Sequence, residues 1–137
     1  MANYHFKKYI PGLHHVGSYQ VAGLPYVTGS STHAAAQEIK YEFNNVSSRV
    51  IVMNHSTQTV RVHFTPTGSQ AIGVVGGLHY VELTSTTASI DLNVKCKELY
   101  VSTPDDNSAN ASYRIVAELT AIPAAEMVNL TGSGLTD

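Results

Sequence analysis

The chain is predicted to be an all-β protein, a β-sandwich of the jelly-roll or immunoglobulin-like type with an extended N-terminal arm. Short segments with alternating apolar and polar residues follow one another through residues 38–122, and turn residues separate them. No segment has a convincing amphipathic helical period, and strands spaced roughly 8 to 12 residues apart are typical of sandwiches. We therefore expect an arm over 1–37, a sandwich over 38–122 and a tail over 123–137. Both sandwich types stay open, because hairpins and Greek keys leave the same local signals.

Three strands are expected in the first half of the sandwich. In QEIKYEF (37–43) every second residue is apolar, the pattern of a half-buried strand. Residues 50–53 are apolar on both faces, which indicates a central strand covered from two sides. In TVRVHF (59–64) the valines and Phe64 are expected to point inward, and Arg61 and His63 outward.

The second half continues the same pattern. Residues 71–83 form a glycine-punctuated segment that predicts two short strands or a bulge at Gly76 and Gly77. ASIDLNV (88–94), ELYVS (98–102) and SYRIVAEL (112–119) predict further strands, and PDDNSAN (104–110) predicts an exposed loop. Pro123 is expected to end the last strand.

The arm is predicted from its glycines and prolines, which interrupt every candidate helix or strand before residue 38. Its aromatic residues recur every few positions and would give an extended segment something to bury against a neighbouring subunit. Imidazoles at such a contact can each form one hydrogen bond and stack a ring face. The expected interface residues are Tyr4, Tyr9, His14, His15, Tyr19 and Tyr26.

Composition limits the partners that the chain could bind. The formal net charge of −2 gives no basic stripe for nucleic acid or for an anionic membrane, so neither partner is expected. No apolar stretch is as long as a signal peptide or a membrane span requires, so neither is expected. Charged residues make up only 13% of the chain, about half the usual share. This composition favours a surface that neighbouring subunits cover.

The candidate chemistry does not point to an enzyme. No His-x-His or Cys-x-x-Cys pair occurs among the seven histidines and one cysteine, so we expect no metal and no cofactor. Cys96 continues an alternating apolar run and is expected to be buried. The Ser133 region lacks the strand and helix that a nucleophile elbow needs. Glu38, Glu42, Glu82 and Glu118 lie on predicted polar strand faces, where solvated carboxylates are ordinary.

Four segments carry a resemblance to a known group of proteins. They are PGLHHVGSYQVAGLPYVTGS (11–30), GVVGGLHYVEL (73–83), VKCKELYVSTP (94–104) and ASYRIVAELTAIP (111–123). In these segments, and nearly end to end, the chain resembles small virion structural proteins of tailed phages that infect marine cyanobacteria. The resemblance implies a β-rich subunit of the capsid exterior or of the neck and tail, without enzymatic activity, assembled in the host cytoplasm.

Among these roles, a capsid decoration or cement protein is the first expectation. An arm that adds a strand to a neighbour's sheet would stabilise a shell between capsomers. The expected partners are the major capsid protein, or neighbouring neck or tail proteins, and further copies of the chain, with a trimer predicted from threefold shell symmetry. The alternatives are a ring-forming neck or tail protein, and a module that binds host glycans through residues 105–110 or through exposed tyrosines.

Overall fold

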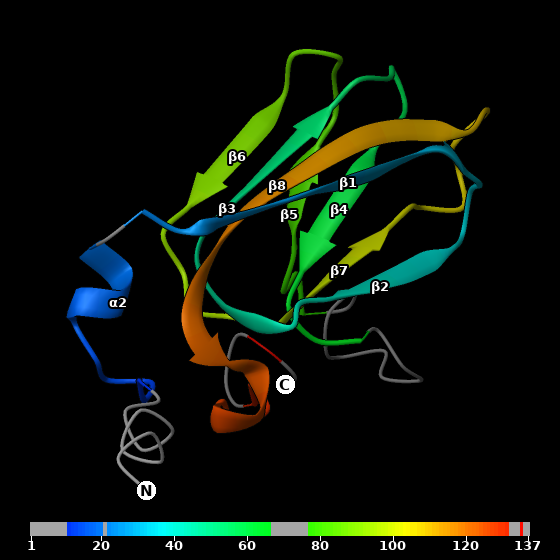
Figure 1. Ribbon diagram of the computed structural model, residues 1–137. Helices are drawn as coiled ribbons and strands as arrows, with labels where there is room; N and C mark the ends of the chain where they lie inside the picture. The colour runs from blue at the N-terminus through cyan, green and yellow to red at the C-terminus, as the bar shows by residue number, and fades with distance from the viewer. Residues whose placement is uncertain (1–10, 21, 67–76, 132–134, 136–137) are drawn as a thin grey trace, which may run out of the picture.

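The computed structural model describes residues 11–20, 22–66, 77–131 and 135, which form eight strands in two four-stranded antiparallel sheets (Figure 1). One sheet has the order β1-β8-β3-β6 and the other β2-β7-β4-β5. The strands are β1 (Leu24–His33), β2 (Glu38–Glu42), β3 (Asn45–Asn54), β4 (Val60–His63), β5 (Val81–Leu83), β6 (Ser89–Leu92), β7 (Glu98–Ser102) and β8 (Ala111–Pro123).

The strands pair in a regular way along the chain. The first strand pairs with the last, β2 with β7, β3 with β6, and β4 with β5. The described chain therefore runs out through β1 to β4 and returns antiparallel to itself through β5 to β8. Successive pairs fall alternately in the two sheets.

The core lies between the two sheets and is built from the inward side of each strand. From β8 it takes Tyr113, Ile115 and Ala117, all fully buried. Val62 of β4 and Leu99 of β7 meet them from the other sheet. Cys96 is also fully buried, which confirms the expected position of the single thiol.

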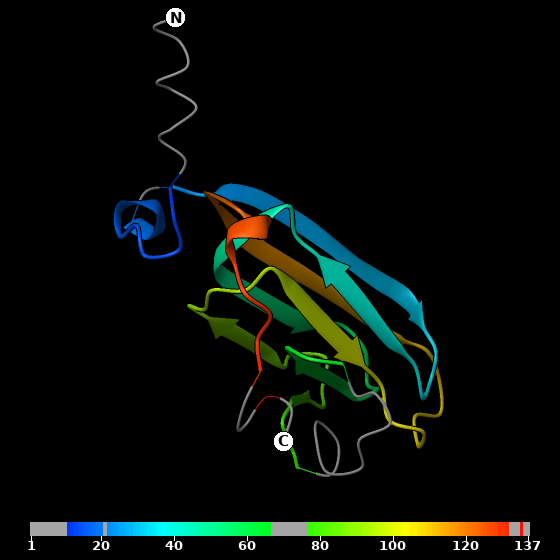
Figure 2. The same cartoon turned by 90° about the horizontal axis from the view of Figure 1, so that it is seen from below.

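The N-terminal boundary of the sandwich differs from the predicted one. Residues Leu24–His33 are not part of an extended arm but form β1, which pairs with β8 from Leu24↔Leu119 to His33↔Ala111. In both views β1 (blue) runs beside β8 (orange) (Figures 1 and 2). Sequence alternation missed this strand because Pro25 and Gly29 interrupt it. An edge strand tolerates both residues, since one of its sides needs no hydrogen bonds.

One end of the sandwich is closed by segments from both ends of the chain. A single helical turn, α2 (Gly17–Gln20), precedes β1, and a 3-10 turn, η1 (Ala124–Glu126), follows β8. Met127 packs with Val46 and Ile122 in a small apolar cluster, against which Leu13 and Tyr19 also pack. The first part of the predicted tail therefore packs on the sandwich through Met127 and Leu130. Residues 132–134 and 136–137 lie outside the described residues.

The other strand predictions are confirmed within one or two residues, except that β3 and β8 are longer than the segments expected over 50–53 and 112–119. Of the two short strands expected over 71–83, the second is β5. Residues 71–76 lie outside the described residues.

Gly29 gives a test of the β1 to β8 pairing. A Cβ at Gly29 would overlap the carbonyl oxygen of Tyr113 and lie 2.9 Å from Cδ of Arg114. We expect Gly29→Ala to lower the free energy of unfolding by about 1 to 3 kcal/mol, because backbone must move to admit the methyl group. Denaturant unfolding measures the change. Gly12→Ala is the matched control, since a Cβ there meets nothing within 4 Å. Equal stabilities of the two variants would contradict the close approach.

Candidate functional site

The predicted interface residues do not gather in one place. Tyr4 and Tyr9 lie outside the described residues. His14 is exposed, while Nδ1 of His15 accepts a hydrogen bond from the backbone N–H of Ser18 at 3.2 Å and so supports the α2 turn. Tyr26 packs edge-on against Phe43 in its own core, with ring centroids 4.9 Å apart. Contacts of these side chains with another subunit stay a prediction.

Tyr19 is held by its own chain. Its hydroxyl donates to the carbonyl oxygen of Leu13 at 2.5 Å, and Nζ of Lys95 lies 4.7 Å from its ring centroid. Burial raises the pKa of the Tyr19 hydroxyl. Tyr19 thus connects the α2 turn to the segment between β6 and β7, in which Lys95 lies.

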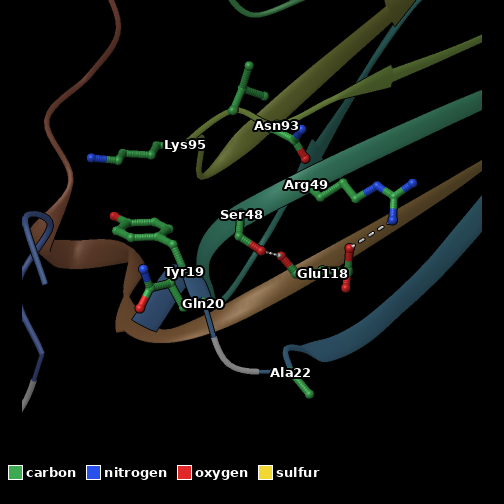
Figure 3. Close-up of a pocket in the computed structure, with 9 residues that line it drawn as sticks. Tyr19, Gln20, Ala22, Ser48, Arg49, Asn93, Lys95 and Glu118 are labelled. Atoms are coloured by element: carbon green, nitrogen blue, oxygen red, sulfur yellow. Dashed lines mark hydrogen bonds and ion pairs between the residues drawn. The ribbon is translucent and has the colours of Figure 1, made fainter. Parts of the chain in front are cut away.

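Beside Tyr19 there is a hollow of about 510 Å³ on the outer side of the β1-β8-β3-β6 sheet (Figure 3). Tyr19 and Lys95 line one side of it, and Arg49 with Glu118 line the other. The remaining lining residues are Gln20, Ala22, Ser48, Asn93 and Val94.

Arg49 is the electrostatic centre of this region. Its Nε donates to Oδ1 of Asp91 at 2.8 Å, and its Nη1 lies 3.5 Å from a carboxylate oxygen of Glu118. These hydrogen bonds raise the pKa of the Arg49 guanidinium, and Arg49 lowers the pKa of Asp91. All three groups are exposed or half-buried, so their pairing fixes orientation more than it stabilises the fold.

The hollow continues into the outer face of the sheet, which we name the β8 face. Three rows of side chains cross it from strand to strand. The register of the strands places Pro25, Glu118 and Arg49 in the first row, Val27, Val116, Ile51 and Asp91 in the second, and Gly29, Arg114, Met53 and Ser89 in the third. The middle row is apolar over three strands. Val27 is 67% exposed, and Val116 and Ile51 are half-buried.

The outer face of the other sheet, which we name the β7 face, has a different character. It carries Glu38, Lys40, Glu42, Arg61, His63, Glu82, Glu98, Tyr100 and Ser102. Lys40 pairs with Glu42 at 2.9 Å and with Glu98 at 3.1 Å, and Arg61 pairs with Glu82 at 3.3 Å. These ion-paired side chains are exposed or half-buried, whereas His63, Tyr100 and Ser102 on the same face are buried. The two outer faces therefore differ, and the β8 face is the candidate site for binding another macromolecule.

Two histidines are buried inside the chain. Nε2 of His33 donates to the carbonyl oxygen of Gln37 at 3.0 Å, so its Nδ1 must accept from the Tyr113 hydroxyl at 2.8 Å. The Tyr113 hydroxyl in turn lies 2.7 Å from that of Tyr41. Burial lowers the pKa of His33 and raises that of Tyr113.

His63 lies on the outer side of β4, as the alternation predicts, and yet it is only 1% exposed. Its Nδ1 donates to the carbonyl oxygen of Thr65 at 2.7 Å, and Nε2 accepts from Ser102 at 2.9 Å. Burial lowers the pKa of His63, and the Arg61 charge acts in the same direction. The hydrogen bond to Thr65 and the Glu38 carboxylate oppose this shift. Its imidazole also stacks on Tyr100, with centroids 5.8 Å apart.

In the described part of the chain, no group of three or more His, Cys, Asp or Glu side chains is placed to hold a metal ion. Burial raises the pKa of the Cys96 thiol to about 11, so the thiol is protonated at neutral pH. None of the described helices is long and apolar enough to cross a membrane.

Comparison of the chain with protein-family models, with curated proteins and with solved structures finds no match. The site therefore has to be interpreted from its own geometry.

Sequence reasoning did not single out the residues of the β8 face. One signal was present, since residues 50–53 are apolar on both faces. Val50 and Val52 lie in the core, whereas Ile51 and Met53 lie on the β8 face. The cover that the sequence predicts for this second side is not part of the described chain.

The buried histidines predict a pH dependence of stability. The folded-state pKa values of His33 and His63 lie below the unfolded value of about 6.5. The folded state therefore binds protons at these two imidazoles less readily than the unfolded state does. The contribution of the two histidines to the free energy of unfolding is fully present above pH 6.5 and is lost as the pH is lowered. Thermal melting at a series of pH values should show this fall.

The variant His63→Gln keeps a donor and an acceptor but does not titrate, so its melting temperature should fall less on acidification. His14→Gln is the control at an exposed position and should follow the wild type. A wild-type melting temperature that is constant between about pH 7.5 and pH 5 would contradict the pKa shifts.

Proposed function

We propose that the protein is a non-enzymatic structural subunit of a phage virion, and that it decorates and cements the capsid shell. The β8 face is the observation that carries this proposal. An apolar row over three strands, with Val27 67% exposed, indicates that a neighbouring molecule covers this face. The resemblance of the sequence to small virion proteins supports the same class.

The strand order supports a jelly-roll type of sandwich. In an immunoglobulin-type sandwich the first and last strands lie in different sheets. Here β1 and β8 are neighbours in one sheet. Of the remaining strand pairs, β3 with β6 lies in that sheet, and β2 with β7 and β4 with β5 lie in the other. Jelly rolls of eight strands occur in viral capsid proteins, and also in lectins and cupins, so the fold agrees with the proposal without requiring it.

The partners in this proposal are the major capsid protein and further copies of the chain. A contact repeated at every equivalent site of a shell can be weak and still stabilise the whole particle. The part that an arm could play is smaller than the sequence predicts, because β1 belongs to the sandwich. The trimer expected from threefold symmetry stays a prediction, and a ring in the neck or tail is the alternative location.

The location can be tested on purified phage particles by mass spectrometry and by immunogold electron microscopy. We expect the protein in the particles and the label over the heads, because a decoration protein covers the shell. Particles lacking the protein should release their DNA at a lower temperature than complete particles. Label confined to the neck or tail would favour the alternative location, and absence from purified particles would contradict the virion role.

The hollow favours a second candidate function, the binding of a host glycan. Tyr19, Gln20 and Asn93 offer an aromatic ring and amide groups along one concave surface, the kind of lining that sugars need. We expect any binding in a glycan array to be weakened in Gln20→Ala, because that amide lines the hollow. Glu42→Ala, at an exposed position on the β7 face, is the control. No binding by the wild type would exclude this candidate.

A further inference from the structure

The middle row of the β8 face is unusual for the outer side of an antiparallel sheet. Such a side is normally polar, because only the inward side faces the core. Here Val27, Val116 and Ile51 stand side by side on adjacent strands. They form a continuous apolar strip across three strands of the sheet, and Asp91 ends it on β6.

The two charges that β8 carries on either side of this row have opposite signs, and Arg49 lies beside Glu118 on the same side. On β8 itself, Arg114 lies on one side of Val116 and Glu118 on the other, all three pointing outward. Nη1 of Arg114 donates to the carbonyl oxygen of Tyr113 at 2.9 Å, and no carboxylate among the described residues forms an ion pair with Arg114. Counting Arg49 and Asp91, the charges of the face cancel.

The side chains of the β8 face project little from the sheet, so another flat surface can approach it closely. Gly29 has no side chain, and Cδ of Arg114 lies close to where its Cβ would be. Arg114 therefore lies across β1 and does not stand up from the sheet. Pro25 and Ser89 add only small side chains at the edges of the face.

We propose that the β8 face binds the β8 face of a second copy of this chain, about a twofold axis that runs along the middle row. Rotation about this axis places each strand over the same strand of the second copy, in the opposite direction. Val27, Val116 and Ile51 then pack against their own equivalents. The backbone position of Arg114 in each copy lies over that of Glu118 in the other. Two equivalent ion pairs form when Arg114 turns away from β1 and Glu118 turns away from Arg49.

The charges select this orientation over the other simple one. A twofold axis parallel to the strands would place Arg114 over Arg114 and Glu118 over Glu118, and both like-charge pairs are unfavourable. Asp91 meets its equivalent in the proposed arrangement, but in each copy Arg49 already neutralises it. Sheets that pack face to face normally cross at about 30°, which separates the corners and keeps the centre in contact.

The size of the face predicts a weak dimer. Four strands about 4.8 Å apart offer less than the roughly 800 Å² per partner of a standard interface. We therefore expect a dissociation constant in the micromolar range or weaker. This contact does not rest on the virion role, but it uses the same face as the proposed contact with the shell and predicts a dimer in place of the trimer. One copy of the face cannot make both contacts at once.

Sedimentation equilibrium of the full chain, from micromolar to millimolar concentration, tests the dimer. We expect a reversible monomer to dimer equilibrium for the wild type and a monomer for Val116→Lys, which places two like charges at the axis. Val116 points outward, so the variant should melt at or near the wild-type temperature. A wild type that is monomeric throughout, or that forms trimers, would overturn the proposal.

Charge reversal tests the orientation and does not depend on the lysine variant. Arg114→Glu alone and Glu118→Lys alone should each weaken dimerisation by roughly tenfold or more, because each creates two like-charge pairs. A mixture of the two variants should form heterodimers, and the double variant R114E/E118K should regain the homodimer.

Glu42→Lys is the matched control for these reversals. It reverses an exposed glutamate on the β7 face that also lies beside a cation, and it should leave dimerisation unchanged. A double variant as weak as the single ones would overturn the proposed pairing of Arg114 with Glu118. Equal weakening by Glu42→Lys would show that net charge, and not this contact, controls self-association.

Discussion

The position of β8 between β1 and β3 is the constraint on which the rest of the structure depends. β8 is paired on both sides along most of its length, so its backbone groups are satisfied within one sheet. Its inward residues, from Tyr113 to Leu119, form the centre of the core. Its outward residues, Arg114, Val116 and Glu118, form the centre of the β8 face. The pleat of a single strand thus supplies both the stability of the sandwich and its candidate binding surface.

The parts of the fold that could be predicted are those in which burial of one strand face produces an alternating sequence pattern. Alternation in residues 38–42 and 112–119 reflects one buried and one exposed face, so β2 and β8 are read correctly. β1 leaves no such trace, because an edge strand with Pro25 and Gly29 is defined by its partner, which lies near the other end of the chain. The burial of His63 leaves no local trace for a similar reason. Its burial depends on Thr65 and Ser102, and the alternation of β4 carries no information about Ser102 on β7.

The candidate site was even less accessible to sequence reasoning. Patterns for metals and catalysis concern spacing along the chain, whereas the β8 face arises from register between strands. Val27, Val116 and Ile51 are far apart in sequence and become neighbours only when β1, β8 and β3 pair. The aromatic residues that the sequence favoured behave differently, since Tyr19 and Tyr26 pack within their own chain. The candidate binding surface of this chain is thus made of ordinary residues that strand pairing brings together.

The pairing of the first strand with the last also affects how the protein can be made. On the ribosome, β1 emerges long before β8, and its only neighbour in the sheet is still unsynthesised. β3 waits in the same way, because β8 and β6 are its two neighbours. Such nonlocal strand pairing is slow to form and leaves unpaired edges exposed in the meantime. The sandwich can therefore close only after β8 has left the ribosome, and until then the unpaired edges of β1 and β3 are exposed to aggregation.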